Sequence, residues 1–108
     1  MSLQRLATLN TGATIPLVGL GSYESKTNEV KQAVLTALEA GYRHIDTAWI
    51  YGNEKEIGEA IQESKVPRSE LFVTTKIWNN SHRPEDILPA LETSLKNLGL
   101  DYVDLYLM

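Results

Sequence analysis

Residues 41–54 read GYRHIDTAWIYGNE, and the organisation of the whole chain can be worked out from them. The segment from Arg43 to Asp46 is short and lies between two expected helices, as a central parallel strand does. After Asp46 a brief loop carries Tyr51 to the start of the next helix. A second β-rich run ends in the same way, at Lys76. We therefore expect ionisable side chains at the ends of two strands of one sheet.

On either side of this segment the chain alternates between expected strands and helices. Two short apolar runs, 6–9 and 15–18, flank an Asn-Thr-Gly turn and predict a small hairpin, with Pro16 keeping the second run at a sheet edge or a strand start. Apolar residues then recur at helical spacing in three segments. The first expected helix covers 27–40, the second begins at Asn53, and the third covers 84–98. The expected core strands are 17–21, 43–46, 71–76 and 103–108.

Several helix ends carry capping signals. We expect Thr27 to cap the first helix, and Asn53 with Glu56 has the spacing of a capping box in which Asn replaces the usual Ser or Thr. Pro89 lacks a backbone donor, so the third helix either has an irregular first turn or begins regularly nearer Leu88.

The expected strand ends recur about every 25 to 32 residues, which is the length of one βα unit. This repeat predicts a parallel sheet with right-handed crossovers. Two architectures fit: part of an eight-stranded (β/α) barrel, or an open doubly wound sheet. In both of them ligands bind at the carboxyl ends of the strands.

The composition indicates one unit over residues 1–108, with no second domain, because 43% hydrophobic residues suffice for one packed core. A net charge of -4 provides no positive field for a nucleic acid. No hydrophobic signal core or membrane-spanning apolar run is evident. The chain has no cysteine and only two histidines, too few for a metal site. We expect a cytoplasmic protein without a metal and without a membrane or nucleic acid partner.

Asp46, Tyr51 and Lys76 form a constellation suited to proton transfer. Free tyrosine has a pKa of about 10 and is a poor acid at neutral pH. A nearby lysine ammonium favours the phenolate and makes the phenol a better acid, while Asp46 favours the charged lysine. Spacing alone also fits a structural Asp–Lys pair beside a tyrosine that only packs, and it leaves both interpretations open.

At these residues the chain resembles the aldo-keto reductase family. The similar segments cover nearly the whole chain and are 17–21, 41–48, 51–54, 71–76 and 100–107. The resemblance implies a (β/α) barrel that binds NADPH and reduces aldehydes or ketones to alcohols, most like the enzymes of yeasts and fungi. It also implies that Tyr51 donates the proton, that Lys76 activates it, and that Asp46 is the partner of the lysine.

The resemblance extends to the walls of the site. It implies cofactor contacts at Gly21, Ser22, Tyr23 and Asp46. It implies a pocket for a small carbonyl substrate lined by Tyr23, Ile50 and Trp78. Ser22 and Tyr23 match positions that commonly hold Thr and Trp, and the tyrosine is expected to change the shape of the pocket.

The resemblance further implies a half-barrel, with four of eight strands preceded by the hairpin, and places the family's catalytic histidine directly after residue 108. Activity is then expected only in the complete barrel. If the four open strands exposed about eight apolar side chains, the lost burial would amount to about 10 to 20 kcal/mol. We therefore expect the missing half or a second copy to cover the sheet. The alternative is a non-catalytic half-barrel module that self-associates.

Overall fold

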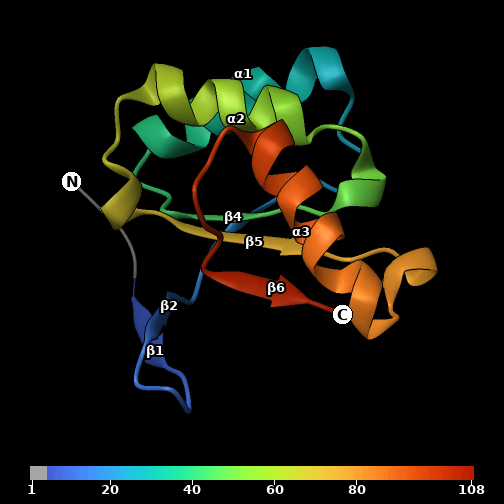
Figure 1. The fold of residues 1–108 in the computed structure, drawn as a ribbon. Helices are drawn as coiled ribbons and strands as arrows, with labels where there is room; N and C mark the ends of the chain where they lie inside the picture. Colours follow the sequence, from blue (N-terminus) through green and yellow to red (C-terminus); the bar gives the residue numbers. More distant parts are fainter. Residues whose placement is uncertain (1–4) are drawn as a thin grey trace.

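The computed structural model of the chain describes residues 5–108, and Figure 1 shows how its elements are arranged. Residues 1–4 lie outside this range. The predicted absence of a hydrophobic signal core therefore falls partly on residues that the structure does not describe. The strands are β1 (Leu6–Thr8), β2 (Thr14–Pro16), β3 (Leu20–Gly21), β4 (His44–Asp46), β5 (Phe72–Lys76) and β6 (Leu105–Leu107). The helices are α1 (Thr27–Glu39), α2 (Glu54–Ser64) and α3 (Pro84–Leu98), with short 3-10 turns η1 (Trp49–Tyr51), η2 (Arg68–Glu70) and η3 (Asn79–Ser81).

The main sheet is parallel, and its strands lie in chain order, β3-β4-β5-β6. Figure 1 shows the three helices on one side of this sheet, and α2 packs between α1 and α3. A doubly wound fold would place helices on both faces. The order and the single helical layer are those of a sector of a (β/α) barrel, which confirms the first of the two predicted architectures.

The predicted hairpin is also confirmed, since β1 and β2 pair antiparallel with Leu6 opposite Pro16. It lies at the amino ends of the central strands, where Leu6 and Pro16 line a cavity together with Phe72 and Asp104. The opposite edge of the sheet, at the carboxyl ends of the strands, is therefore free of the hairpin.

The hydrophobic core lies between the sheet and the helices. Ile45 of β4 and Val73 of β5 are neighbours in register, and both are fully buried in one cluster with Val34, Ile57 and Leu98 from the three helices. Because side chains alternate along a strand, the residues on either side of Ile45 and Val73 point to the other face. We call that other face of the sheet the inner face.

Over β4, β5 and β6 the inner face is mostly polar. In β4, β5 and β6 its positions hold His44, Asp46, Phe72, Thr74, Lys76, Leu105 and Leu107. Phe72 is buried, so only the two leucines leave apolar area open, and Leu107 is 38% exposed. The polar residues pair with one another, as His44 Nε2 does with Thr74 Oγ1 at 3.1 Å. Over β4–β6 the open apolar side chains are thus fewer than the sequence estimate of about eight assumed for four strands, and Leu17 and Val18 of the expected first strand are also exposed.

Element ends differ from the predictions in specific ways. The core strand β3 begins at Leu20 and not at Leu17, because the Leu17 amide donates to the Arg5 carbonyl and continues the hairpin. The N-cap of α1 is Lys26, one residue before Thr27. Helix α3 begins at Pro84 and continues through Pro89. The predicted later start of the regular helix, near Leu88, is therefore not observed.

Across residues 5–108, none of the helices has the length and apolar character that a bilayer crossing requires.

Candidate active site

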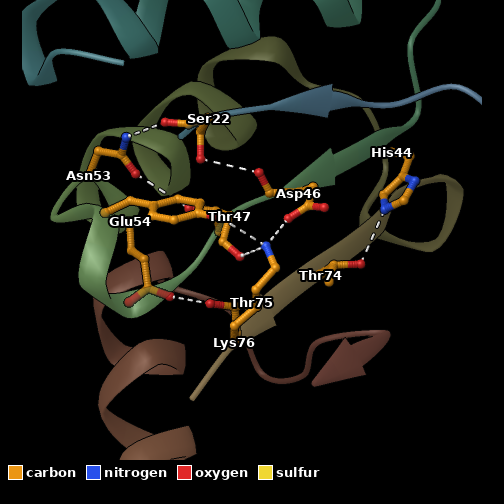
Figure 2. Close-up of polar contacts among 10 residues, drawn as sticks. Ser22, His44, Asp46, Thr47, Asn53, Glu54, Thr74, Thr75 and Lys76 are labelled. Atoms are coloured by element: carbon orange, nitrogen blue, oxygen red, sulfur yellow. Dashed lines mark hydrogen bonds and ion pairs between the residues drawn. The ribbon is translucent and has the colours of Figure 1, made fainter. Parts of the chain in front are cut away.

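The site is assembled at the carboxyl ends of β4 and β5. Asp46 is opposite Thr74 in the parallel register, and Lys76 follows two residues later on the same face of the sheet. The Lys76 ammonium forms an ion pair with Asp46 Oδ1 and donates to the Thr47 carbonyl at 3.1 Å and to Tyr51 Oη at 3.3 Å. Figure 2 shows Lys76 pointing toward Asp46 and Thr47. An ammonium has three donors, and here each has an acceptor.

This arrangement keeps Lys76 positively charged. Burial lowers the pKa of Lys76, but the hydrogen bonds to Asp46 and Tyr51 and the electrostatic attraction to both raise it by more. The net pKa of Lys76 lies above the ordinary value for lysine. The pair is not sealed from water, since the side chains of Lys76 and Asp46 are 28% and 41% exposed. A cation therefore lies at a rim that a small molecule can reach.

Tyr51 reaches this rim from the turn η1. The turn follows extended backbone at Ala48 and ends at Gly52, whose φ of 72° is in the left-handed region that glycine adopts without strain. The Tyr51 ring stacks on Tyr23 with the ring centroids 5.2 Å apart, and Lys76 Nζ lies 5.1 Å from the Tyr51 centroid. The structure thus brings together the three residues that the sequence predicted as catalytic, with Tyr23 beside them.

Asn53 connects the loop after β3 to this site. Its amide nitrogen donates to the Ser22 carbonyl at 3.1 Å and to the Ser25 carbonyl at 3.3 Å, and its oxygen accepts from Thr47 Oγ1 at 3.3 Å. Because the side chain makes these bonds, it does not cap α2, and the predicted capping box is absent from this helix start. Asn53 instead fixes the loop that carries Tyr23.

Ser22 and Tyr23 are neighbours on that loop, but the first is buried and the second is exposed. Ser22 is 1% exposed, and its hydroxyl donates to the Asp46 carbonyl at 3.2 Å. Tyr23 is 62% exposed and forms the open surface. The cofactor contact expected of Ser22 stays a prediction, and its hydroxyl has a structural partner here.

The expected pocket residues Ile50 and Trp78 are both partly exposed and line separate hollows. Trp78 lines a cavity of about 150 Å³ with Trp49, Ile77 and Tyr106. Ile50 lines another, of about 440 Å³, with Glu54. In residues 5–108 these side chains form walls near the site, and the pocket they are predicted to share stays a prediction.

Sequence reasoning missed Glu54, a buried carboxylate behind the site. Thr75 Oγ1 donates to Glu54 Oε2 at 2.7 Å, and Asn97 Nδ2 donates to Oε1 at 3.3 Å. The signal was present, because Glu54 precedes Ile57 and Ile61 by three and seven residues and so belongs to the buried stripe of α2. The apolar pattern alone places the start of the stripe at Ile57, because Glu54 is charged.

Comparisons with known proteins agree with this geometry. A model of the aldo/keto reductase family matches residues 17–108. The chain is 60% identical to glycerol 2-dehydrogenase (NADP(+)) of Saccharomyces cerevisiae over 96% of this chain and 33% of that protein. It is 51% identical to D/L-glyceraldehyde reductase of Hypocrea jecorina over 100% of this chain and 34% of that protein.

Solved structures show the same similarity in three dimensions. The aldo-keto reductase of Bombyx mori in complex with NADP matches with a TM-score of 0.94 and 51% identity, over 97% of this chain and 38% of that one. An aldo/keto reductase from Brucella melitensis matches with a TM-score of 0.95 and 49% identity, over 100% of this chain and 41% of that one. The chain spans about a third of the length of the curated relatives it matches. From the family match, the identities and the superposable fold, we conclude that the chain belongs to the aldo/keto reductase family.

Proposed function

We propose that the complete barrel containing this chain is an NADPH-dependent reductase that converts aldehydes or ketones to alcohols, with Tyr51 as the proton donor. The observation that carries the proposal is the Lys76 ammonium held between Asp46 and Tyr51 at the strand ends. The names of two relatives, a glycerol 2-dehydrogenase (NADP(+)) and a D/L-glyceraldehyde reductase, support this reaction class and this cofactor.

The residues of the site supply the proton half of the reaction. NADPH, when bound, supplies the hydride for the carbonyl carbon. Tyr51 Oη donates its proton to the carbonyl oxygen, which completes the alcohol, and the Tyr51 phenolate then regains a proton from water. Lys76 stabilises the negative charge left on the Tyr51 oxygen, and Asp46 holds the lysine charged and in place.

The residues at the rim fit a nucleotide cofactor. Asp46 uses Oδ1 for Lys76, and its partly exposed carboxylate can accept a further hydrogen bond from a ribose hydroxyl. A Cβ built on Gly21 would meet no atom within 4 Å, so the space over the end of β3 is open. The exposed Tyr23 ring adds a surface on which a planar ring can stack. These are the groups that would hold NADPH in this part of the barrel.

The test uses two proteins: the 108-residue chain, and a complete-barrel version in which the yeast relative supplies the strands and helices beyond residue 108. We expect the complete-barrel version to consume NADPH in the presence of glyceraldehyde, and the 108-residue chain to bind NADPH weakly and to show no turnover. A folded complete-barrel version without NADPH-dependent reduction of aldehydes or ketones would contradict the proposed reaction. Turnover by the 108-residue chain at a similar rate would contradict the assignment of activity to the complete barrel.

A further inference from the structure

Glu54 is 3% exposed and is the one buried carboxylate among residues 5–108. Burying a carboxylate is costly unless it is hydrogen-bonded, so its partners indicate what it holds in place. The short bond goes to Thr75 Oγ1, at 2.7 Å, and the longer one to Asn97 on α3. Figure 2 shows Glu54 and Thr75 pointing toward each other, next to Lys76.

The Glu54–Thr75 bond connects the neighbours of two site residues. Glu54 follows Tyr51 by three residues, and Thr75 directly precedes Lys76 on β5. On the other side of η1, the Thr47 amide donates to the Thr74 carbonyl at 2.8 Å. The segment that carries Tyr51 is thus attached to β5 at both of its ends.

Between these two attachments the buried Asn53 is a third anchor, bonded to Ser22, Ser25 and Thr47, but the turn η1 itself is held less firmly. None of the three residues of η1 is buried, and the turn ends at the flexible Gly52. Tyr51 Oη is 3.3 Å from Lys76 Nζ, near the upper limit for a hydrogen bond, so a shift of about 1 Å breaks the contact. The position of the phenol therefore depends on the anchors that flank the turn, and the Glu54–Thr75 bond is one of them.

From these contacts we propose that Glu54 is a positioning residue, whose bond to Thr75 keeps the Tyr51 hydroxyl against the Lys76 ammonium. This inference rests on the proposed role of Tyr51 as proton donor. Glu54 bonds Thr75 and Asn97, and the bonds of Lys76 go to Asp46, Thr47 and Tyr51, so Glu54 acts through the backbone of the turn. Misplacement of a reacting group by about 1 Å lowers a rate about 100-fold.

The first experiment measures kcat and the KM for NADPH in the complete-barrel version. Thr75→Val removes the hydroxyl at nearly constant shape, and Glu54→Ala removes the carboxylate. We expect both to lower kcat by about 10- to 100-fold with little change in the KM for NADPH. Glu54→Gln and Thr75→Ser keep the hydrogen bond and are expected to retain most of the rate. Glu59→Gln, on the exposed side of α2, is the matched control.

The second readout is independent of turnover. The pKa of Lys76, followed by NMR of a ¹³Cε-labelled lysine in the same variants, reports its contact with Tyr51, because that hydrogen bond helps to raise the pKa. We expect Thr75→Val and Glu54→Ala to lower the pKa of Lys76, and Glu59→Gln to leave it unchanged. If Tyr51→Phe retained full activity, the proposed function would fail, and this titration would still decide whether Glu54 positions Tyr51.

Two results would overturn the inference. One is that folded Thr75→Val or Glu54→Ala keeps kcat within about twofold of the wild type. The other is that kcat falls only as much as the folded fraction falls, while the pKa of Lys76 in the folded protein does not move, which would make the bond purely structural. Should Glu54→Ala not fold, Thr75→Val decides by the same two measurements.

Discussion

At the scale of single residues, Lys76 connects the parts of the candidate site. Its ammonium bonds a carboxylate from β4, a backbone carbonyl just after β4, and the phenol of η1. Removing one acceptor leaves the other two in place but changes the balance that sets the charge of the lysine. The pKa of Lys76 is therefore the property that reports most directly on the electrostatics of the site.

Asp46→Asn is predicted to lower the pKa of Lys76, because the hydrogen bond and charge of Asp46 oppose the effect of burial. NMR titration of ¹³Cε-labelled lysine in the 108-residue chain measures the change, with Glu59→Gln as the control. The folded chain holds this pKa above that of the unfolded chain. The pairing thus stabilises the fold fully below about pH 10.4 and is lost as the pH rises through the folded-state pKa.

Asp46→Asn is accordingly expected to weaken the alkaline pH dependence of the free energy of unfolding that comes from Lys76. A Lys76 pKa equal to that of the wild type in Asp46→Asn would show that the ion pair does not control the charge of the lysine.

The two charged residues of the candidate site were predictable because they end strands, whereas their supports were not. A parallel sheet brings its strand ends to one edge, so Asp46 and Lys76 could be placed together from the sequence. The bonds made by Asn53 depend on where the loop after β3 passes, which no local pattern specifies. For Glu54, the only signal in the sequence was its helical spacing from the buried residues of α2, which predicts burial but not its hydrogen-bond partners.

At the scale of elements, the helices are held by very close backbone contact. A Cβ built on Gly58 of α2 would lie 2.1 Å from the carbonyl oxygen of Leu98 at the end of α3. Glycine at this position therefore sets the separation of the two helices, and with it the place of Asn97 beside Glu54.

Gly58→Ala is predicted to destabilise the chain by about 1 to 3 kcal/mol, because the added methyl group meets backbone that cannot move aside. This loss exceeds the gain of about 1 kcal/mol in helix propensity. Urea unfolding of the 108-residue chain measures the change. Glu59→Ala, one residue along on the exposed face, is expected to stay within about 0.5 kcal/mol of the wild type. Equal stability of Gly58→Ala and wild type would refute the close contact.

Element types followed from hydrophobic periodicity, but their ends depended on tertiary contacts. The three helices and the parallel strands were predicted at nearly their observed positions. The apolar run from Leu17 predicts a core strand, although the Leu17 amide bonds the carbonyl of Arg5, next to the hairpin strand β1. Pro89 was expected to disturb α3, although the helix is continuous through it. For Leu17 the local signal was overruled by pairing with the hairpin.

At the scale of the whole molecule, the inner face decides how the chain behaves on its own. The strand pattern predicted parallel strands but not which side chains would face inward, since both faces of such strands are often apolar. With Leu105 and Leu107 as the open apolar side chains of β4–β6, covering the face contributes at most about 3 to 6 kcal/mol. For these three strands this is below the total of about 10 to 20 kcal/mol expected for the open faces of four.

We propose that this smaller apolar area still supports weak self-association of the 108-residue chain. Sedimentation velocity is predicted to show a concentration-dependent shift from monomer to a larger species, which Leu107→Gln reduces. Leu88→Gln removes a leucine on α3 that is even more exposed than Leu107 and is expected to leave the shift unchanged. A monomer at all concentrations would contradict this proposal.

The central claim concerns Tyr51, and the most direct test is the rate of carbonyl reduction by Tyr51→Phe in the complete-barrel version. The variant keeps the ring that stacks on Tyr23 and removes only the hydroxyl that Lys76 contacts. With Tyr51 as general acid, kcat is predicted to fall by about 100- to 10,000-fold while the affinity for NADPH is retained. Tyr102→Phe, remote from the site beside Arg68, is the matched control. A Tyr51→Phe enzyme with the wild-type kcat would contradict the account.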